Sequence, residues 1–177
     1  MRYSIRKLLL LSSFALIMAL LLLLSPQSAT SSQAASLAGG KVIVVSISRQ
    51  WLYVYNNGAL VYNTPATTGQ AALSTPTGSY RVFAKLSPTT FTSPWPKGSP
   101  YYYPPTYINY ALEWLGGGFF IHDSSWRSVY GPGTNVRHYD PASGWLTGTH
   151  GCVTIPLRAA AWLYNWTPIG TLVQINP

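Results

Sequence analysis

The chain has 177 residues and a net charge of +8, with 11 lysines and arginines, three acidic residues and a single cysteine, Cys152. One cysteine excludes a disulfide within the chain, and its distance from the N-terminus excludes a lipoprotein. The basic residues are scattered singly, which is unlike a nucleic-acid-binding surface. This charge suits an envelope with anionic polymers or lipid head groups, or serves solubility alone.

The N-terminal segment has the layout of a secretory signal. Two arginines and a lysine within the first seven residues precede an uncharged, mostly apolar run from Leu8 to Leu24, and small polar residues follow. We therefore expect export to the cell wall or periplasm, with cleavage after Ala29 or Ala35. The apolar run is long for a cleaved signal and short for a membrane span, so an uncleaved N-terminal membrane anchor is the alternative.

Composition divides the chain into three parts. Residues 1–35 are the signal or anchor with the start of a tether, and residues 36–40 continue that flexible tether with small, uncharged side chains. Residues 41–177 are long enough for one domain with its own hydrophobic core. Removing the three positive charges of the signal from the total of +8 leaves +5 on this domain.

The domain opens with a predicted β-meander. A β-branched run covers 41–48, and two strand-like runs within 50–64 flank Asn57 and Gly58, a dipeptide typical of a tight hairpin turn. After a turn, residues 80–85 are predicted to form a further strand. Strands thus dominate the first half of the domain.

The next segment, 87–106, is rich in proline and aromatic residues and has no apolar period. Loops of this length in compact domains are usually functional lids or binding loops. The alternative is an ordered wrap over the sheet, with its aromatic side chains as plugs.

Two strands are predicted over 106–114 and 119–123, joined by three glycines, and residues 124–147 are expected to be mostly loop. The one convincing helix covers 156–167, and a last strand covers 171–176. The pattern predicts a single, mainly β domain with one short helix that follows Cys152.

The exported free thiol of Cys152 has three interpretations: a small buried hydrophobe, an intermolecular disulfide partner or a nucleophile. Its neighbours favour the nucleophile. Gly151 allows a sharp backbone turn, so that the N–H groups of Gly151 and Cys152 can point at one developing oxyanion. The helix that follows could also stabilise a thiolate with its positive end.

A thiol nucleophile needs a base, and the chain has three histidines: His122, His138 and His150. His122 ends an apolar strand-like run that could hold it rigidly, whereas His138 lies in a polar loop. His150 sits in the turn itself, where it could shape the backbone. His122 is therefore the predicted base.

Asp123 is a tempting third member. If both residues are on one strand, however, the side chains of His122 and Asp123 leave on opposite faces, so the carboxylate cannot reach the neighbouring imidazole. We expect a backbone carbonyl to orient the ring and the Asp123 side chain to cap a loop.

At this point the residues resemble the L,D-transpeptidases of bacterial cell walls, the YkuD-type catalytic domain. The family signature has an upstream histidine on a strand, then Ser or Thr, His, Gly, Cys, a hydrophobic residue and commonly Asn; this chain offers His122 and "THGCVT". The opening hairpin and "TTGQAALSTPTGSYRV" are also similar to the family. The resemblance covers most of 41–177 and implies a β-sandwich or barrel-like fold.

Position by position, the resemblance implies Cys152 as the acylated nucleophile and His122 as its base, oriented by the Asp123 carbonyl. It implies an oxyanion hole formed by the N–H groups of His150, Gly151 and Cys152. The implied reaction attacks the third residue of a peptidoglycan tetrapeptide stem, releases D-alanine and joins the thioester to the amine of a second stem. Carbapenem-type inhibitors are implied as ligands, and no metal or other cofactor is expected.

Two positions depart from the family pattern. The interval of 30 positions from His122 to Cys152 (152 − 122) is longer than usual, which suggests an enlarged loop, and Thr154 stands where asparagine is common. A stem peptide offers carboxylates, which an arginine can bind bidentately, and groove-lining aromatics would hold its backbone. The expected substrate contacts are Thr149, Thr154, Arg137, Arg158, Tyr103 and Trp95.

Three other functions are alternatives to the L,D-transpeptidase. An L,D-carboxypeptidase would use the same Cys152 and His122 with water as acceptor, so the sequence does not separate it from the transferase. A papain-like peptidase fits poorly, because the cysteine follows the base and lies late in a β-rich domain. A non-catalytic wall-binding module would explain the basic, aromatic surface but would leave Cys152 without a role. The acceptor, the diamino acid of the stem and the oligomeric state stay open.

Overall fold

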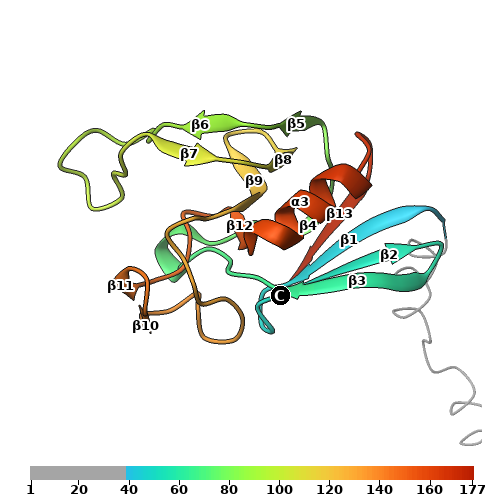
Figure 1. The fold of residues 1–177 in the computed structure, drawn as a ribbon, viewed down its shortest axis with the longest axis horizontal. Coiled ribbons are helices and arrows are strands. Elements are labelled where there is room, and N and C mark those ends of the chain that lie inside the picture. Colours follow the sequence, from blue (N-terminus) through green and yellow to red (C-terminus); the bar gives the residue numbers. More distant parts are fainter. Residues whose placement is uncertain (1–38) are drawn as a thin grey trace, which may run out of the picture. The chain divides into compact units, whose positions relative to one another are not determined.

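The computed structural model describes residues 39–177. The predicted signal or anchor, its cleavage points after Ala29 and Ala35, and most of the tether lie outside the described residues. The described part is mainly β-structure with one α-helix, as the sequence predicts (Figure 1). It contains no helix that is long and apolar enough to cross a membrane.

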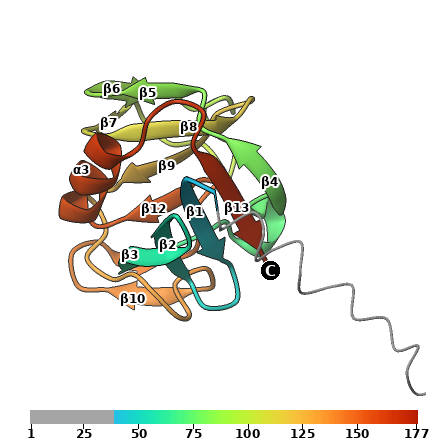
Figure 2. The same cartoon turned by 90° about the vertical axis from the view of Figure 1, so that its right-hand side faces the viewer.

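Five strands form the larger sheet, in the order β3-β2-β1-β13-β4 (Figure 2). Strand β1 pairs antiparallel with β2 and parallel with β13. The predicted hairpin between β2 and β3 is confirmed: Asn57 and Gly58 have φ angles of +49° and +80°, as a tight hairpin turn of this kind requires. The strands are Lys41–Ser46 (β1), Trp51–Asn56 (β2), Ala59–Pro65 (β3), Gly78–Arg81 (β4) and Leu172–Asn176 (β13).

The second sheet has the order β12-β9-β8-β5, with β12 parallel to β9 and the other pairs antiparallel. Its strands are Ala84–Leu86 (β5), Ala111–Leu115 (β8), Phe119–Asp123 (β9) and Val153–Ile155 (β12). A parallel neighbour cannot follow through a tight turn, so a long crossover has to connect β9 to β12. That crossover, residues 124–152, carries much of the candidate site.

Two small hairpins extend from these sheets. Strand β6 (Thr89–Phe91) pairs with β7 (Thr106–Ile108), and β10 (His138–Asp140) pairs with β11 (Gly144–Leu146). The segments 87–106 and 124–147, predicted as loops, thus each contain strands. These strands have three residues, which is too short for a sequence period to reveal.

The predicted strand over 80–85 is divided in the structure between β4 and β5, which belong to different sheets. The N–H of Val82 donates to Thr171 O beside the larger sheet, whereas the N–H of Phe83 donates to Glu113 O in the second. The chain changes sheets between these two residues. The predicted strand over 106–114 is likewise divided, into β7 and β8.

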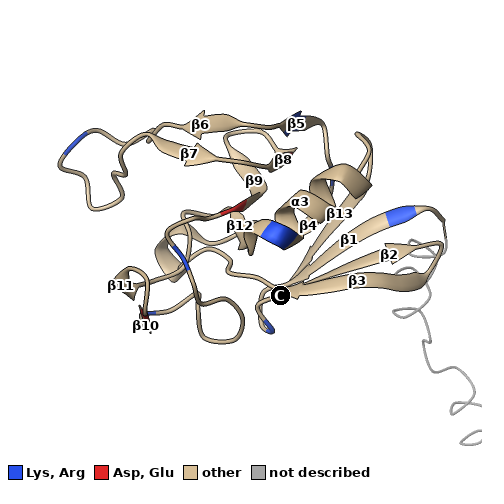
Figure 3. Ribbon diagram, in the orientation of Figure 1, with Lys and Arg blue, Asp and Glu red and all other residues tan. Residues whose placement is uncertain are grey.

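Charged residues are few and lie singly along the described chain (Figure 3). Three of them are buried: Asp123, Arg127 and Asp140. Burying a charge is unfavourable unless it is hydrogen-bonded or paired. All three lie at the end of β9 or in the crossover 124–152, which gives this long connection a polar interior of its own.

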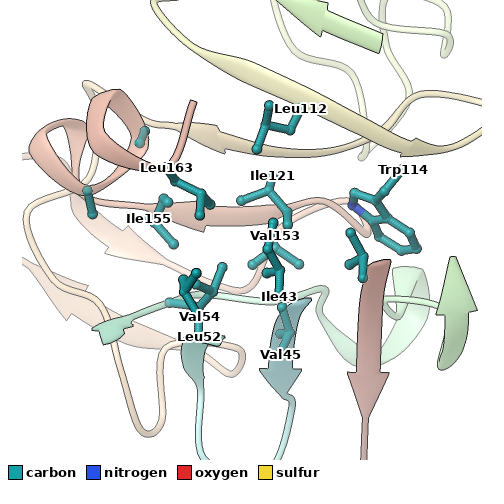
Figure 4. Close-up of a cluster of buried hydrophobic side chains, with 14 of the residues drawn as sticks. Ile43, Val45, Leu52, Val54, Leu112, Trp114, Ile121, Val153, Ile155 and Leu163 are labelled. Atoms are coloured by element: carbon teal, nitrogen blue, oxygen red, sulfur yellow. The ribbon is translucent and has the colours of Figure 1, made fainter. Parts of the chain in front are cut away.

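The main hydrophobic core lies between the two sheets and helix α3 (Leu157–Trp166), which packs against β8 and β9 (Figure 4). Strand β9 contributes Ile121 to this core. Because side chains alternate along a strand, Phe120 and His122 face the other way. There a smaller cluster of Ile108, Ala111 and Phe120 packs against Cys152. One face of β9 thus packs into the main core, and the opposite face carries His122 near Cys152.

Candidate active site

The pairing of β12 with β9 brings the cysteine and the predicted base together. Thr154 lies opposite His122 in this parallel ladder, and Cys152 lies two positions before Thr154. The N–H of Phe120 approaches Cys152 Sγ at 3.5 Å, and the thiol donates to Gly118 O at 3.3 Å. The thiol is therefore held against the β8–β9 turn, on the face of the sheet that carries His122.

Residues 149–152 form a turn. One of its positions, Gly151, suits only glycine. Gly151 has a φ of +109°, and a Cβ added there would lie 2.7 Å from Phe119 Cε1. Thr149 Oγ1 accepts the N–H of Gly151 at 3.1 Å and donates to Cys152 O at 2.5 Å. The Thr149 hydroxyl thus ties the turn together.

This geometry bears on the oxyanion hole that the resemblance implies. The N–H of Gly151 already has Thr149 Oγ1 as its acceptor, so it is not free to bind an oxyanion in this conformation. Helix α3 begins at Leu157, five residues after Cys152, and the extended strand β12 lies between them, which is roughly 16 Å along the chain. A helix dipole acts mainly within its first turn, so α3 adds little at the thiol.

His122 is buried and its ring has one orientation. Nδ1 lies 2.7 Å from the carbonyl oxygen of Asp123, the contact that the resemblance implies. A carbonyl oxygen only accepts, so Nδ1 carries the proton and Nε2 keeps a lone pair. Burial lowers the pKa of His122 to about 4, which keeps the imidazole neutral at neutral pH.

The Asp123 side chain is buried and serves the fold. Oδ1 accepts the N–H groups of Asn109 at 3.0 Å and Tyr110 at 2.7 Å, and Oδ2 accepts Asn109 Nδ2 at 2.8 Å. The carboxylate therefore caps the chain between β7 and β8, and the imidazole is left to the backbone carbonyl.

A cavity of about 500 Å³ opens over this face, and both Cys152 and His122 line it. Removal of water from the thiol raises the pKa of Cys152 to about 11, and the negative charge of Glu113 adds to the rise. Together with the low pKa of His122, this favours a neutral thiol and a neutral imidazole at rest. Such a pair can transfer a proton when a substrate carbonyl is attacked.

The proline- and aromatic-rich segment packs over the turn. The ring of Tyr103 stacks on His150 with centroids 5.5 Å apart, and Trp95 and Tyr101 contact the same imidazole at 5.2 and 6.3 Å. Tyr103 also lines the cavity, and burial raises its pKa. Trp95, a predicted substrate contact, is not part of the cavity wall and contacts His150 instead. The segment is ordered against the turn, and part of it walls the cavity.

Three of the predicted substrate contacts lie on the cavity wall. Thr149, Thr154 and Tyr103 line the cavity. Thr154 is also bonded through its backbone to Thr67, with N···O distances of 2.8 and 2.9 Å in the two directions. These residues are brought together with the thiol, as the sequence analysis expects.

The two predicted arginines are not part of the cavity wall. Arg137 is exposed and stacks over the Trp145 ring at 4.4 Å, and Arg158 is exposed on the first turn of α3. Arg127 lines the cavity instead and was missed, because 124–147 was expected to be a solvated loop. Its position five residues after His122 is the only signal that the sequence offers for it.

The histidine, cysteine and acidic side chains of the described chain do not gather into a metal-binding cluster. Within residues 39–177, no group of three or more histidine, cysteine or acidic side chains is arranged to hold a metal ion.

Comparison with known proteins places this geometry in a family. A profile of the L,D-transpeptidase catalytic domain, YkuD, matches residues 40–175. The probable L,D-transpeptidase 3 of Mycobacterium tuberculosis is 29% identical over 63% of this chain and 38% of its own length. The L,D-transpeptidase 1 of that species is 24% identical over 75% of this chain and 49% of its own length. The chain thus spans less than half of these curated relatives.

Solved structures agree in fold. An L,D-transpeptidase from Mycobacterium smegmatis superposes with a TM-score of 0.64 at 24% identity, covering 77% of this chain and 58% of that one. The M. tuberculosis L,D-transpeptidase 3, in complex with a faropenem-derived adduct, has a TM-score of 0.61 at 25% identity, covering 78% and 60%. From the profile match across nearly all of residues 39–177, this chain belongs to the YkuD family of L,D-transpeptidase catalytic domains.

Proposed function

We propose that this protein is a peptidoglycan L,D-transpeptidase that works outside the cytoplasm, with Cys152 as nucleophile and His122 as general base. The observation that carries the proposal is the placement of both side chains on one cavity, with His122 Nδ1 held by the Asp123 carbonyl at 2.7 Å. A fixed tautomer leaves Nε2 as the only ring atom that can accept a proton. Family membership supports the reaction class.

Acylation begins when Cys152 Sγ attacks the carbonyl carbon of the third, L-centred residue of a tetrapeptide stem. Nε2 of His122 takes the thiol proton and then delivers it to the nitrogen of the departing D-alanine, so the peptide bond breaks as the thioester forms. The low pKa of His122, about 4, makes its imidazolium a strong acid for that delivery.

Transfer repeats these steps in reverse order. The side-chain amine of a second stem attacks the thioester carbonyl, Nε2 removes a proton from that amine, and the proton returns to the sulfur. The products are a cross-link between two third-position residues and the free thiol. One peptide bond is exchanged for another, so no ATP is needed.

The negative charge that develops on the carbonyl oxygen needs N–H donors. We assign this role to the N–H groups of His150 and Cys152, because the N–H of Gly151 is donated to Thr149. Gly151 contributes through its positive φ, which turns the flanking amides. The stacking of Tyr103 on His150 supports the same turn from outside.

Inhibitor binding is proposed on the same thiol. Among the structural relatives, one L,D-transpeptidase is in complex with imipenem and another carries a faropenem-derived adduct. We propose that carbapenem-type β-lactams acylate Cys152 of this chain, since a strained lactam carbonyl meets the same nucleophile and base. Loss of the adduct in Cys152→Ala would be the supporting result.

The test of the overall reaction is product analysis by mass spectrometry after incubation with a disaccharide-tetrapeptide. The proposal predicts free D-alanine together with a cross-linked dimer, and neither product with Cys152→Ala. Tripeptide without dimer at high acceptor concentration would show an L,D-carboxypeptidase instead. No product from a correctly folded protein would contradict an enzymatic role on this donor and favour a wall-binding module.

A further inference from the structure

Among residues 39–177, Arg127 is the only lysine or arginine on the wall of the cavity that holds the thiol. It lies in the crossover 124–152, and only 8% of its surface is exposed. The cavity is otherwise lined by aromatic, small and hydroxyl-bearing residues and by Leu146. A buried cation thus lies on the wall of the cavity that also holds the proposed nucleophile.

The partners of the guanidinium are neutral. Nη2 donates to Thr147 O at 2.8 Å, and Nη1 lies 3.1 Å from His138 Nε2. His138 Nδ1 is 2.9 Å from the carbonyl of Val136, so Nδ1 carries the proton and Nε2 accepts from Arg127. Both contacts orient the guanidinium without neutralising it.

One N–H of the group has no acceptor. Nε of Arg127 is fully buried and is without a hydrogen-bond partner in the described chain. A guanidinium has five N–H donors in a planar fork, and the protein uses two of its nitrogen atoms here. Nε is buried, so the donors that remain for a ligand in the cavity are the second N–H groups of Nη1 and Nη2.

The acidic residues nearby are occupied by other groups. The Asp140 carboxylate accepts the backbone N–H groups of Ser128, Val129 and Ala142 and the hydroxyl of Ser128, at 2.6 to 2.9 Å. Arg127 has no ion pair with any residue in 39–177, and burial lowers its pKa despite the charge of Asp140. A buried cation without a paired anion is unfavourable, so keeping one suggests that an anion arrives with the substrate.

We propose that Arg127 binds a carboxylate of the donor peptide and thereby positions the scissile carbonyl over Cys152. The inference rests on the proposed function for the identity of the donor, and on Arg127 itself for the chemistry. A tetrapeptide stem can present this carboxylate from its terminal D-alanine or from the side chain of its third residue. Both have the planar, two-oxygen shape that a guanidinium fork binds well.

The experiment measures binding and turnover separately. Binding of the tetrapeptide is followed by calorimetry on the Cys152→Ala protein, with and without Arg127→Gln. Arg49→Gln is the matched control, because Arg49 is exposed and does not line the cavity. We expect Arg127→Gln to weaken binding roughly 10- to 100-fold, the loss typical of a hydrogen-bonded charge, and Arg49→Gln to leave it unchanged. Arg127→Lys, which keeps the charge but not the fork, should fall between them.

The source of the carboxylate is found with modified donors. One donor has its terminal carboxylate converted to an amide, and another has the third-residue side-chain carboxylate converted. One of the two modified donors lacks the carboxylate that Arg127 binds. Its affinity for the parent protein should be as low as the affinity of the unmodified donor for Arg127→Gln. The Arg127→Gln substitution should not weaken the binding of this modified donor any further. This comparison still decides the matter if Arg127→Gln folds poorly, because the parent protein alone must discriminate between the donors.

The outcomes separate this inference from the proposed reaction. The carboxylate site would be overturned if the wild-type protein turned over the donor and Arg127→Gln changed neither donor binding nor kcat/KM. The proposed transpeptidase reaction would still stand. If Arg127→Gln weakened the binding of the unmodified donor and of both modified donors by the same factor, the carboxylate site would also be overturned. Arg127 would then have a purely structural role. Arg127-dependent binding without any release of D-alanine would support the site and contradict the reaction.

Discussion

Thr154 of β12 lies directly opposite His122 of β9 in a parallel ladder. This register places Cys152 two positions back on the same face, where the N–H of Phe120 meets its sulfur at 3.5 Å. Parallel strands with one buried face resist slippage, because a shift of one residue would turn every side chain over. The proposed nucleophile and base are therefore held by strand pairing.

The proposed base is tested by His122→Gln, which keeps a similar size but removes the basic nitrogen. General base catalysis typically contributes about 10²- to 10⁴-fold, so the rate of D-alanine release should fall by that factor. The thermal unfolding midpoint, measured in parallel, checks that the variant is folded. A folded variant that loses less than about 10-fold would contradict the role of His122.

The carboxylate of Asp123 is expected to matter for stability and little for chemistry. In Asp123→Asn one acceptor for Asn109 Nδ2 becomes a second donor, which should lower the free energy of unfolding by about 1–3 kcal/mol. The backbone carbonyl that orients His122 is retained, so D-alanine release per folded molecule should change far less than in His122→Gln. A fully inactive but folded Asp123→Asn would show that the side chain takes part in the reaction.

Gly151→Ala should destabilise the fold for two reasons. The backbone φ is +109°, and a new Cβ would lie 2.7 Å from Phe119. We expect it to lower the free energy of unfolding by about 1–3 kcal/mol and to abolish acylation, because the flanking amides move. Gly170→Ala is the matched control: φ is +90°, with nothing within 4 Å, so only the backbone strain of about 1 kcal/mol applies. Equal stability of the two variants, measured by urea denaturation, would refute the steric argument.

The low pKa of His122 predicts how stability depends on pH. The folded state keeps this imidazole neutral down to about pH 4, whereas the unfolded chain takes up a proton below 6.5. The unfolded state binds more protons in that window, so the free energy of unfolding decreases as the pH falls, by about 3 kcal/mol in total from His122. His150, whose pKa is also lowered by burial, contributes in the same direction.

Urea denaturation between pH 6.5 and 4 measures this dependence. His122→Phe should show a flatter profile than the wild-type protein, because its unfolded state has lost the proton-binding group. His150→Phe keeps the aromatic stacking and should retain most of the slope, since His150 is only half-buried. Identical slopes for the wild-type protein and His122→Phe would contradict a buried neutral imidazole.

Sequence patterns predicted the parts of the fold that depend on local chemistry. The Asn57-Gly58 turn and helix α3 have local signals, and both are in the structure. Strand β12 has three residues and exists through its pairing with β9, so no sequence period could indicate it. The division of 80–85 between two sheets is also a tertiary effect, set by hydrogen bonds to distant segments.

The candidate site shows the same limit. Cys152 and His122 could be selected from residue type and local context, and the structure brings them to one cavity. The sequence did not single out Arg127, because its burial depends on how the crossover folds around Asp140 and on partners at Thr147 and His138. Charge alone did not distinguish it from the exposed arginines.

The central claim is that Cys152 carries the acyl group, and intact-protein mass spectrometry with trypsin mapping tests it most directly. After brief incubation with a tetrapeptide whose third-residue side-chain amine is blocked, so that it cannot serve as acceptor, the protein should gain the mass of the tripeptide acyl group. That mass should lie on the tryptic peptide from His138 to Arg158, which contains the only cysteine. The adduct should be absent in Cys152→Ala and greatly delayed in His122→Gln. An adduct on another peptide, or one that persists in Cys152→Ala, would contradict the account.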